Sequence, residues 1–104
     1  MTTAAWEHFE HRADIGVRGI GRDLAEAFAQ AALAMTAIIT DPAGVRPAHG
    51  IHLACSEPDP ELLLVDWLNQ VIFEMATRHM LFSRFQVSIE DGKLRATAFG
   101  EAIA

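Results

Sequence analysis

The stretch Phe9-Glu10-His11-Arg12-Ala13-Asp14-Ile15-Gly16-Val17-Arg18-Gly19-Ile20-Gly21 lies close to the N-terminus and contains Asp14, the residue on which the functional interpretation of the chain depends. Charged side chains come first, and the carboxylate of Asp14 precedes the alternating Ile15 and Val17, a pattern typical of a half-buried strand. The glycines weaken that strand and mark a bulge or a close approach of another backbone. We therefore expect a loop over residues 10–13 and an acid held at the entrance of the second strand.

Caps and apolar patterns predict five strands and two helices. Asp23 and Asp59 are typical helix N-caps, and Pro60 suits the first position of the second helix. Asp91-Gly92 indicates a type I′ turn, because both central positions need positive φ. The strands are expected over residues 6–9, 15–21, 51–56, 81–89 and 94–98, and the helices over residues 24–38 and 60–78. The order strand, strand, helix, strand, helix, strand, strand predicts an α+β fold in which two helices pack on one mixed β-sheet.

The two helices differ in the width of their apolar surface. The first has a stripe that leaves Gln30 and Thr36 outside it, formed by Leu24, Phe28, Ala31, Met35 and Ile38. The second has a wider stripe, formed by Leu63, Leu64, Trp67, Leu68, Val71, Phe73 and Met75. We therefore expect the second helix to be the central buried one. Its narrow polar stripe of Asp66, Gln70 and Glu74 favours a solvated face over a functional acid at Asp66.

Composition limits the classes of function. A chain of 104 residues with 51 % hydrophobic and 21 % charged residues predicts one packed domain over 1–104. Fourteen acidic against eight basic residues give a net charge of −6, which argues against tight direct binding of nucleic acid. The single Cys55 forms no internal disulfide and is expected to be a small buried hydrophobe. With no export signal and no apolar run that spans a membrane, we expect a cytoplasmic protein.

Asp14 is open to two interpretations. Its carboxylate accepts hydrogen bonds from turn amides, or it is a metal ligand on a glycine-flanked loop where an ion can approach the backbone. His8, His11 and Asp14 recur every three residues and suggest zinc, but in an extended segment that spacing needs a sharp loop to bring them together. A neutral, hydrogen-bonding or exposed role for the histidines is the simpler interpretation.

Two further residues follow the second helix. Ser83 has a hydroxyl that can bond local backbone, and Arg84 can pair with a carboxylate such as Asp66 or Asp14. The chain carries no nucleophile-elbow order of Ser, His and Asp and no paired Cys and His motif. Its glycines lack the Lys and Ser or Thr of a phosphate-binding loop. We therefore expect no catalytic residues.

Five segments, taken together, resemble the archease family over residues 6–101. They are Phe9-Glu10-His11-Arg12-Ala13-Asp14-Ile15-Gly16, Ala31-Ala32-Leu33-Ala34-Met35, Leu63-Leu64-Val65-Asp66-Trp67-Leu68-Asn69, Leu81-Phe82-Ser83-Arg84-Phe85 and Leu94-Arg95-Ala96-Thr97-Ala98-Phe99-Gly100-Glu101. The chain departs from the family pattern at Arg12, where Thr is usual, and at Phe99, where Trp is common.

The resemblance implies a divalent cation, with Ca²⁺ expected, and Asp14 as the matching ligand. The other family ligands, an Asp and a backbone carbonyl, come from a C-terminal segment that would lie beyond Ala104. We therefore expect a C-terminally shortened archease-like domain with an incomplete metal site and weak binding. Loss of that segment would leave a sheet edge unpaired, which favours self-association.

The resemblance also implies a non-enzymatic activator of an RtcB-type RNA ligase, which promotes guanylylation and multiple turnover in tRNA splicing and RNA repair. His11, Asp66, Ser83 and Arg84 are the candidate partner-facing residues. One alternative is a small metal-dependent hydrolase that uses His8, His11 and Asp14. Another is a general chaperone-like interaction module, suggested by the apolar second helix.

Overall fold

The computed structural model of the chain describes residues 5–11, 14–20 and 23–103, with side chains described from residue 23 onward. The elements in chain order are β1 (Ala5–His11), β2 (Asp14–Ile20), α1 (Leu24–Ile39), the 3₁₀ helix η1 (Pro42–Gly44), β3 (His49–Ser56), α2 (Pro60–Arg78), β4 (Met80–Glu90) and β5 (Lys93–Ala102). The α+β class is confirmed. The order differs from the predicted one by η1, which lies where an irregular connection was expected.

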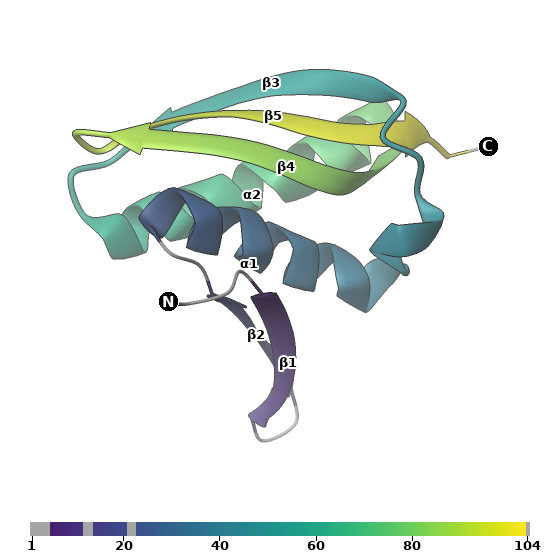
Figure 1. The fold of residues 1–104 in the computed structure, drawn as a ribbon, viewed down its shortest axis with the longest axis horizontal. Coiled ribbons are helices and arrows are strands. Elements are labelled where there is room, and N and C mark those ends of the chain that lie inside the picture. The colour runs from purple at the N-terminus through teal and green to yellow at the C-terminus, as the bar shows by residue number, and fades with distance from the viewer. Residues whose placement is uncertain (1–4, 12–13, 21–22, 104) are drawn as a thin grey trace.

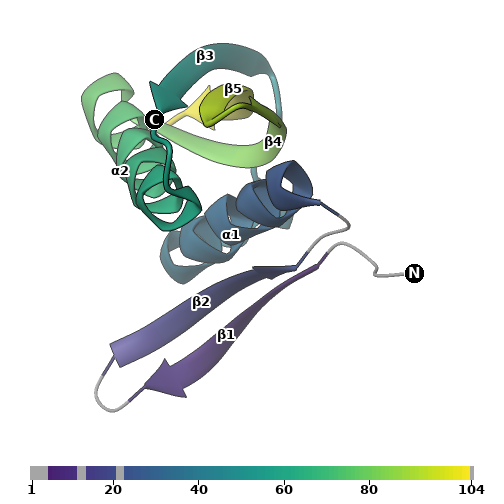
Figure 2. The same cartoon turned by 90° about the vertical axis from the view of Figure 1, so that its left-hand side faces the viewer.

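The strands form two antiparallel sheets, so the prediction of one mixed sheet is wrong. β1 and β2 make a two-stranded hairpin, and the other three strands lie in the order β3-β5-β4 (Figure 1). The reason is the position of α1, which contacts the hairpin on one side and β4 on the other. Figure 2 shows α1 between the two sheets, so the hairpin does not reach an edge of the larger sheet.

The predicted helix starts are confirmed. The Asp23 carboxylate accepts a hydrogen bond from the Glu26 amide at 2.8 Å, and the Asp59 carboxylate accepts one from the Glu61 amide at 2.9 Å. Each bond satisfies one of the amides that a first helical turn leaves without a partner. α2 spans the predicted residues and ends at His79, which takes the left-handed conformation with φ of 51°.

α1 is the central helix, a place that we predicted for α2. It packs through small buried side chains such as Ala32 and Ala34. Thr36, predicted to lie off the apolar stripe, is fully buried, and its hydroxyl is satisfied there because it donates to the Ala32 carbonyl at 2.9 Å. Leu24 and Ile38, predicted on the stripe, are exposed near the two ends of the helix.

α2 covers the larger sheet with one face only. Its buried residues are Leu63, Trp67, Val71 and Met75. Phe73, predicted to be part of the apolar stripe, is 62 % exposed. The outward side of α2 keeps further apolar side chains, namely Leu62, Val65 and Ile72. Neither α2 nor any other helix among the described residues is long and apolar enough to cross a membrane.

Two backbone features shape the larger sheet. Asp91 and Gly92 have φ of 51° and 73°, as the predicted turn between β4 and β5 requires. The register of β4 shifts between Phe82 and Arg84, which marks a β-bulge. Gly100 lies opposite Phe82, and a Cβ there would stand 1.9 Å from the Leu81 oxygen. The bulge therefore brings the two backbones too close for any side chain at residue 100.

Candidate functional site

Asp14 is the first residue of β2, as predicted. Its Cα partner across the hairpin is His11, the last residue of β1. The loop expected over residues 10–13 is wrong for Glu10 and His11, which still pair within β1, and residues 12 and 13 lie outside the described residues. Pairing with β2 extends β1 to His11, beyond residues 6–9, where the alternation of apolar and polar side chains predicted the strand. The register therefore places two candidate residues, Asp14 and His11, directly opposite each other at the end of the hairpin.

The backbone of β1 bears on the zinc interpretation. β1 runs without interruption from Ala5 to His11 and pairs throughout with β2, with His8 opposite Val17. The sharp bend that would bring His8 and His11 together is therefore not present between them. Among the residues whose side chains are described, no group of three His, Cys, Asp or Glu gathers in a way that could hold a metal ion.

Asp66 lies in a cleft where α2 meets β3. The cleft has a volume of about 420 Å³ and is lined by Cys55, Asp66, Asn69, Gln70, Phe73 and Glu74. The side-chain amide of Gln70 donates to the Ala54 carbonyl at 2.9 Å and so connects α2 to β3. Glu74 forms an ion pair with Arg78. Asp66, Gln70 and Glu74 are half-buried. The polar stripe is thus a junction between two elements rather than a fully solvated face.

Two carboxylates meet beside this cleft. A side-chain hydrogen bond with Asp66 raises the pKa of Glu57, and desolvation together with the charges of Asp66 and Asp59 adds to that effect. Desolvation raises the pKa of the Cys55 thiol, and the negative charges of Asp66 and Glu57 raise it further. Cys55 is half-buried rather than fully buried as predicted. The thiol is therefore held in its protonated, unreactive form.

Glu57 is a member of this site that was not predicted from the sequence. It follows β3 directly, and its amide donates to the Gly92 carbonyl at 2.9 Å, which places it beside the β4–β5 turn. The local sequence contains no signal for its meeting with Asp66, because the two residues come together only when α2 packs against β3. Asp66, which was predicted as a single acid, is thus one of two neighbouring carboxylates, the other being Glu57.

Ser83 and Arg84 lie at the β-bulge of β4. The Ser83 hydroxyl oxygen is buried and has no hydrogen-bond partner in the described part of the chain, so the expected bond to local backbone does not form. Arg84 is exposed, and its Cζ lies 5.5 Å from the centroid of the Phe99 ring. Among the described side chains it forms no ion pair with Asp66, which lies on α2. The candidate residues therefore occupy three separate places: the hairpin end, the cleft and the bulge.

The whole fold has relatives. The family model described as the archease protein family matches residues 6–104. The chain belongs to the archease family. It is 39 % identical over 98 residues to protein archease of Sulfurisphaera tokodaii, an alignment that covers 92 % of this chain and 70 % of the relative. It is 40 % identical over 102 residues to protein archease of Methanothermobacter thermautotrophicus, covering 94 % and 73 % of the two chains.

A solved structure carries the same fold. The chain matches the solution structure of protein 1598 from Methanobacterium thermoautotrophicum with a TM-score of 0.83 and 38 % identity. The match covers 96 % of this chain and 74 % of that one. The archease arrangement of hairpin, two helices and three-stranded sheet thus extends over nearly the whole chain.

Proposed function

We propose that this archease family member is a non-enzymatic activator of an RtcB-type RNA ligase. The observation that carries the proposal is the family match, which extends over residues 6–104 and includes the hairpin with Asp14. In the proposal the ligase holds GTP and its own metal and carries the guanylylated histidine. The archease promotes that guanylylation and the return of the ligase to further rounds of RNA joining, in tRNA splicing and RNA repair. We expect both proteins in the cytoplasm.

The net charge supports a ligase as partner. A formal charge of −6 suits a basic, RNA-binding protein, since opposite charges speed encounter and suppress wrong partners. Asp14 lies at the end of the hairpin, and the hairpin is on the far side of α1 from the larger sheet (Figure 2). We propose that this end of the hairpin faces the ligase, with His11 beside Asp14.

Asp14 is also the proposed metal ligand. A Ca²⁺ ion takes about six to eight oxygen ligands, and the register supplies one carboxylate, Asp14, opposite His11. Asp14 can therefore supply one ligand residue of a calcium site, and we propose weak Ca²⁺ binding that depends on it. Calorimetric titration with Ca²⁺ tests this: we expect weak heat that Asp14→Asn abolishes. Tight binding that survives Asp14→Asn would contradict the assignment.

Ligase turnover tests the function itself. RNA joined per ligase molecule is measured without archease, with this chain, and with two matched carboxylate variants. We expect this chain to convert single turnover into multiple turnover, and Asp14→Asn to lose that gain. Asp91→Asn removes the same charge from the exposed β4–β5 turn, where Asn tolerates positive φ, and should keep the gain. Unchanged turnover with this chain would refute the proposal.

One observation favours a second candidate, a general chaperone-like interaction module. The outward face of α2 carries exposed apolar side chains, and such a face is typical of an interaction surface. Its members are Leu62, Val65, Ile72 and Phe73. Suppression of aggregation of several unrelated proteins, unaffected by Asp14→Asn and lost in Phe73→Glu, would support this function. An effect confined to the ligase would refute it.

A further inference from the structure

The larger sheet has one face that no described element covers. Both helices lie beneath β3, β5 and β4 in Figure 1, and the opposite face is open. Burial alternates accordingly along the central strand: Leu94, Ala96 and Ala98 are buried, while Lys93 and Arg95 are exposed. The open face is therefore set by the register of the three strands, and its side chains are those of the outward positions.

The register arranges these outward positions in four rows across the sheet, each with one residue from β3, β5 and β4. The rows are Gly50–Phe99–Arg84, His52–Thr97–Gln86, Ala54–Arg95–Ser88 and Ser56–Lys93–Glu90. Successive rows are about 6.8 Å apart, because each is two residues further along the strands. The open face thus has mostly polar side chains, together with cationic and aromatic ones.

The open face has a charge opposite to that of the whole molecule. Its four rows contain Arg84, Arg95 and Lys93 but a single acid, Glu90, at one end. Beyond the rows, Glu101 is held by Arg46 at 2.9 Å, and Asp91 lies with Glu90 at the Lys93 end of the face. In a chain with fourteen acidic and eight basic residues, this face is a local positive surface.

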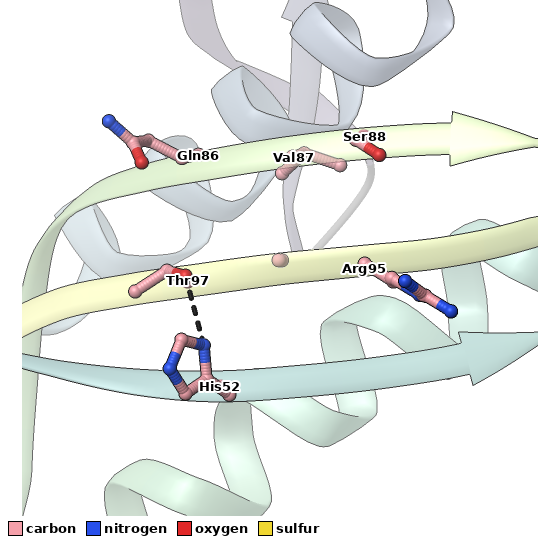
Figure 3. Close-up of a pocket in the computed structure, with 7 residues that line it drawn as sticks. His52, Gln86, Val87, Ser88, Arg95 and Thr97 are labelled. Atoms are coloured by element: carbon pink, nitrogen blue, oxygen red, sulfur yellow. Dashed lines mark hydrogen bonds between the residues drawn. The ribbon is translucent and has the colours of Figure 1, made fainter.

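A shallow hollow lies in the middle of the face. It has a volume of about 270 Å³, and its polar lining residues come from all three strands: His52, Gln86, Ser88, Arg95 and Thr97 (Figure 3). His52 Nδ1 lies 3.2 Å from the Thr97 hydroxyl oxygen, a contact that fixes the imidazole ring. Arg95 is exposed and has no carboxylate partner among the described residues. The hollow therefore presents the Arg95 guanidinium, unpaired within the described residues, beside hydroxyl and amide groups.

An aromatic platform adjoins the hollow. Phe99 is half-buried beside Gly50, where a Cβ would lie 3.2 Å from the Phe99 Cε1 atom, so the glycine leaves room for the ring. The Arg84 guanidinium lies over that ring at 5.5 Å from its centroid. A planar cation on an aromatic ring offers a flat surface on which a nucleic-acid base can stack.

We propose that this open face binds single-stranded nucleic acid, with backbone phosphates at Arg95 and Lys93 and a base stacked at Phe99 and Arg84. An acidic protein segment would use the cations but would leave the aromatic platform without a role, so the combination favours a polynucleotide. The net charge of −6 keeps the binding weak, and the phosphate contacts at Arg95 and Lys93 make it fall as salt rises. The site goes beyond the proposed ligase activation, because it acts on the polynucleotide directly and needs no ligase.

Nuclear magnetic resonance titration without ligase tests the site and leaves the proposed activation to its own assay. Amide shifts are followed as short single-stranded RNA or DNA oligonucleotides are added at low and at moderate salt. We expect shifts confined to β3, β5 and β4 that fade as salt rises. Tighter binding of RNA than of DNA would assign a contact to the 2′-hydroxyl, and equal binding would assign the site to phosphates and bases alone.

Matched variants sharpen the result. Arg95→Gln should weaken binding about tenfold, whereas Arg78→Gln, the same change of charge on α2, should leave it unchanged. Phe99→Leu keeps an apolar side chain but removes the stacking surface, and should also weaken binding about tenfold. Shifts spread over α2, equal effects of Arg95→Gln and Arg78→Gln, or equally tight binding of an oligoglutamate peptide would overturn the proposal.

Discussion

The indole nitrogen of Trp67 donates a hydrogen bond to the main-chain oxygen of Phe28 at 2.9 Å, and this bond joins α2 to α1. Trp67 is fully buried, and its ring meets that of Phe85 edge to face at 5.7 Å between centroids. The two helices and β4 are thus tied together at one side chain. The hairpin depends on this arrangement, because it packs against α1.

Trp67→Phe should lower the free energy of unfolding by about 2 kcal/mol, since it removes the bond to Phe28 and leaves a cavity. Denaturant unfolding followed by circular dichroism measures the loss. Phe73→Leu, on the exposed side of the same helix, should change stability by less than about 0.5 kcal/mol. Equal effects of the two variants would show that Trp67 does not tie the helices together.

Gly100→Ala should destabilise the fold by about 3 kcal/mol. A Cβ at residue 100 would lie 1.9 Å from the Leu81 oxygen, so the backbone of β4 or β5 must shift. Gly44→Ala is the matched control, because a Cβ there meets nothing within 4 Å. Thermal unfolding compares the two variants. A Gly100→Ala protein as stable as Gly44→Ala would disprove the close approach at the bulge.

Glu57→Gln should raise the stability at neutral pH relative to the parent chain. The pKa of Glu57 is raised in the folded protein by its hydrogen bond with Asp66, so the folded state binds more protons than the unfolded state. The parent chain therefore loses stability as pH rises through that pKa, while the Gln variant has a side-chain donor for Asp66 that does not titrate. The gain should vanish below the ordinary pKa of glutamate. Denaturant titrations across that range measure it, and a gain independent of pH would contradict the pairing.

Asp66→Asn should lower the pKa of the Cys55 thiol. Desolvation, the largest cause of the raised pKa, stays, so the value should fall only part of the way towards that of an exposed cysteine. The rate of alkylation by iodoacetamide against pH measures the change. Glu74→Gln removes another carboxylate from the same cleft and should leave the profile in place. If both variants shift it equally, Asp66 has no special influence on the thiol.

The parts of the fold that depend on neighbouring residues were predictable from the sequence. The caps Asp23 and Asp59 accept hydrogen bonds from amides two or three residues away. The turn at Asp91-Gly92 needs only the positive φ angles of these two residues, which both residue types tolerate. Burial was less predictable, because it depends on what covers each face. Thr36 is buried although polar, and Phe73 is exposed although aromatic.

The candidate site divides in the same way. Asp14 was placed correctly at a strand entrance, because the alternation of Ile15 and Val17 is a local signal. The pair of Glu57 and Asp66 was not predictable, since it forms only when α2 packs against β3. The open face of the larger sheet likewise depends on strand register, which brings Arg84 beside Phe99 from different strands.

The most direct measurement of the proposed function is the rate at which an RtcB-type ligase becomes guanylylated with GTP, with and without this archease. We expect a substoichiometric amount of the chain to raise that rate, Asp14→Asn to abolish the increase, and Asp91→Asn to preserve it. The same rate of guanylylation with and without the chain would contradict its assignment as a ligase activator.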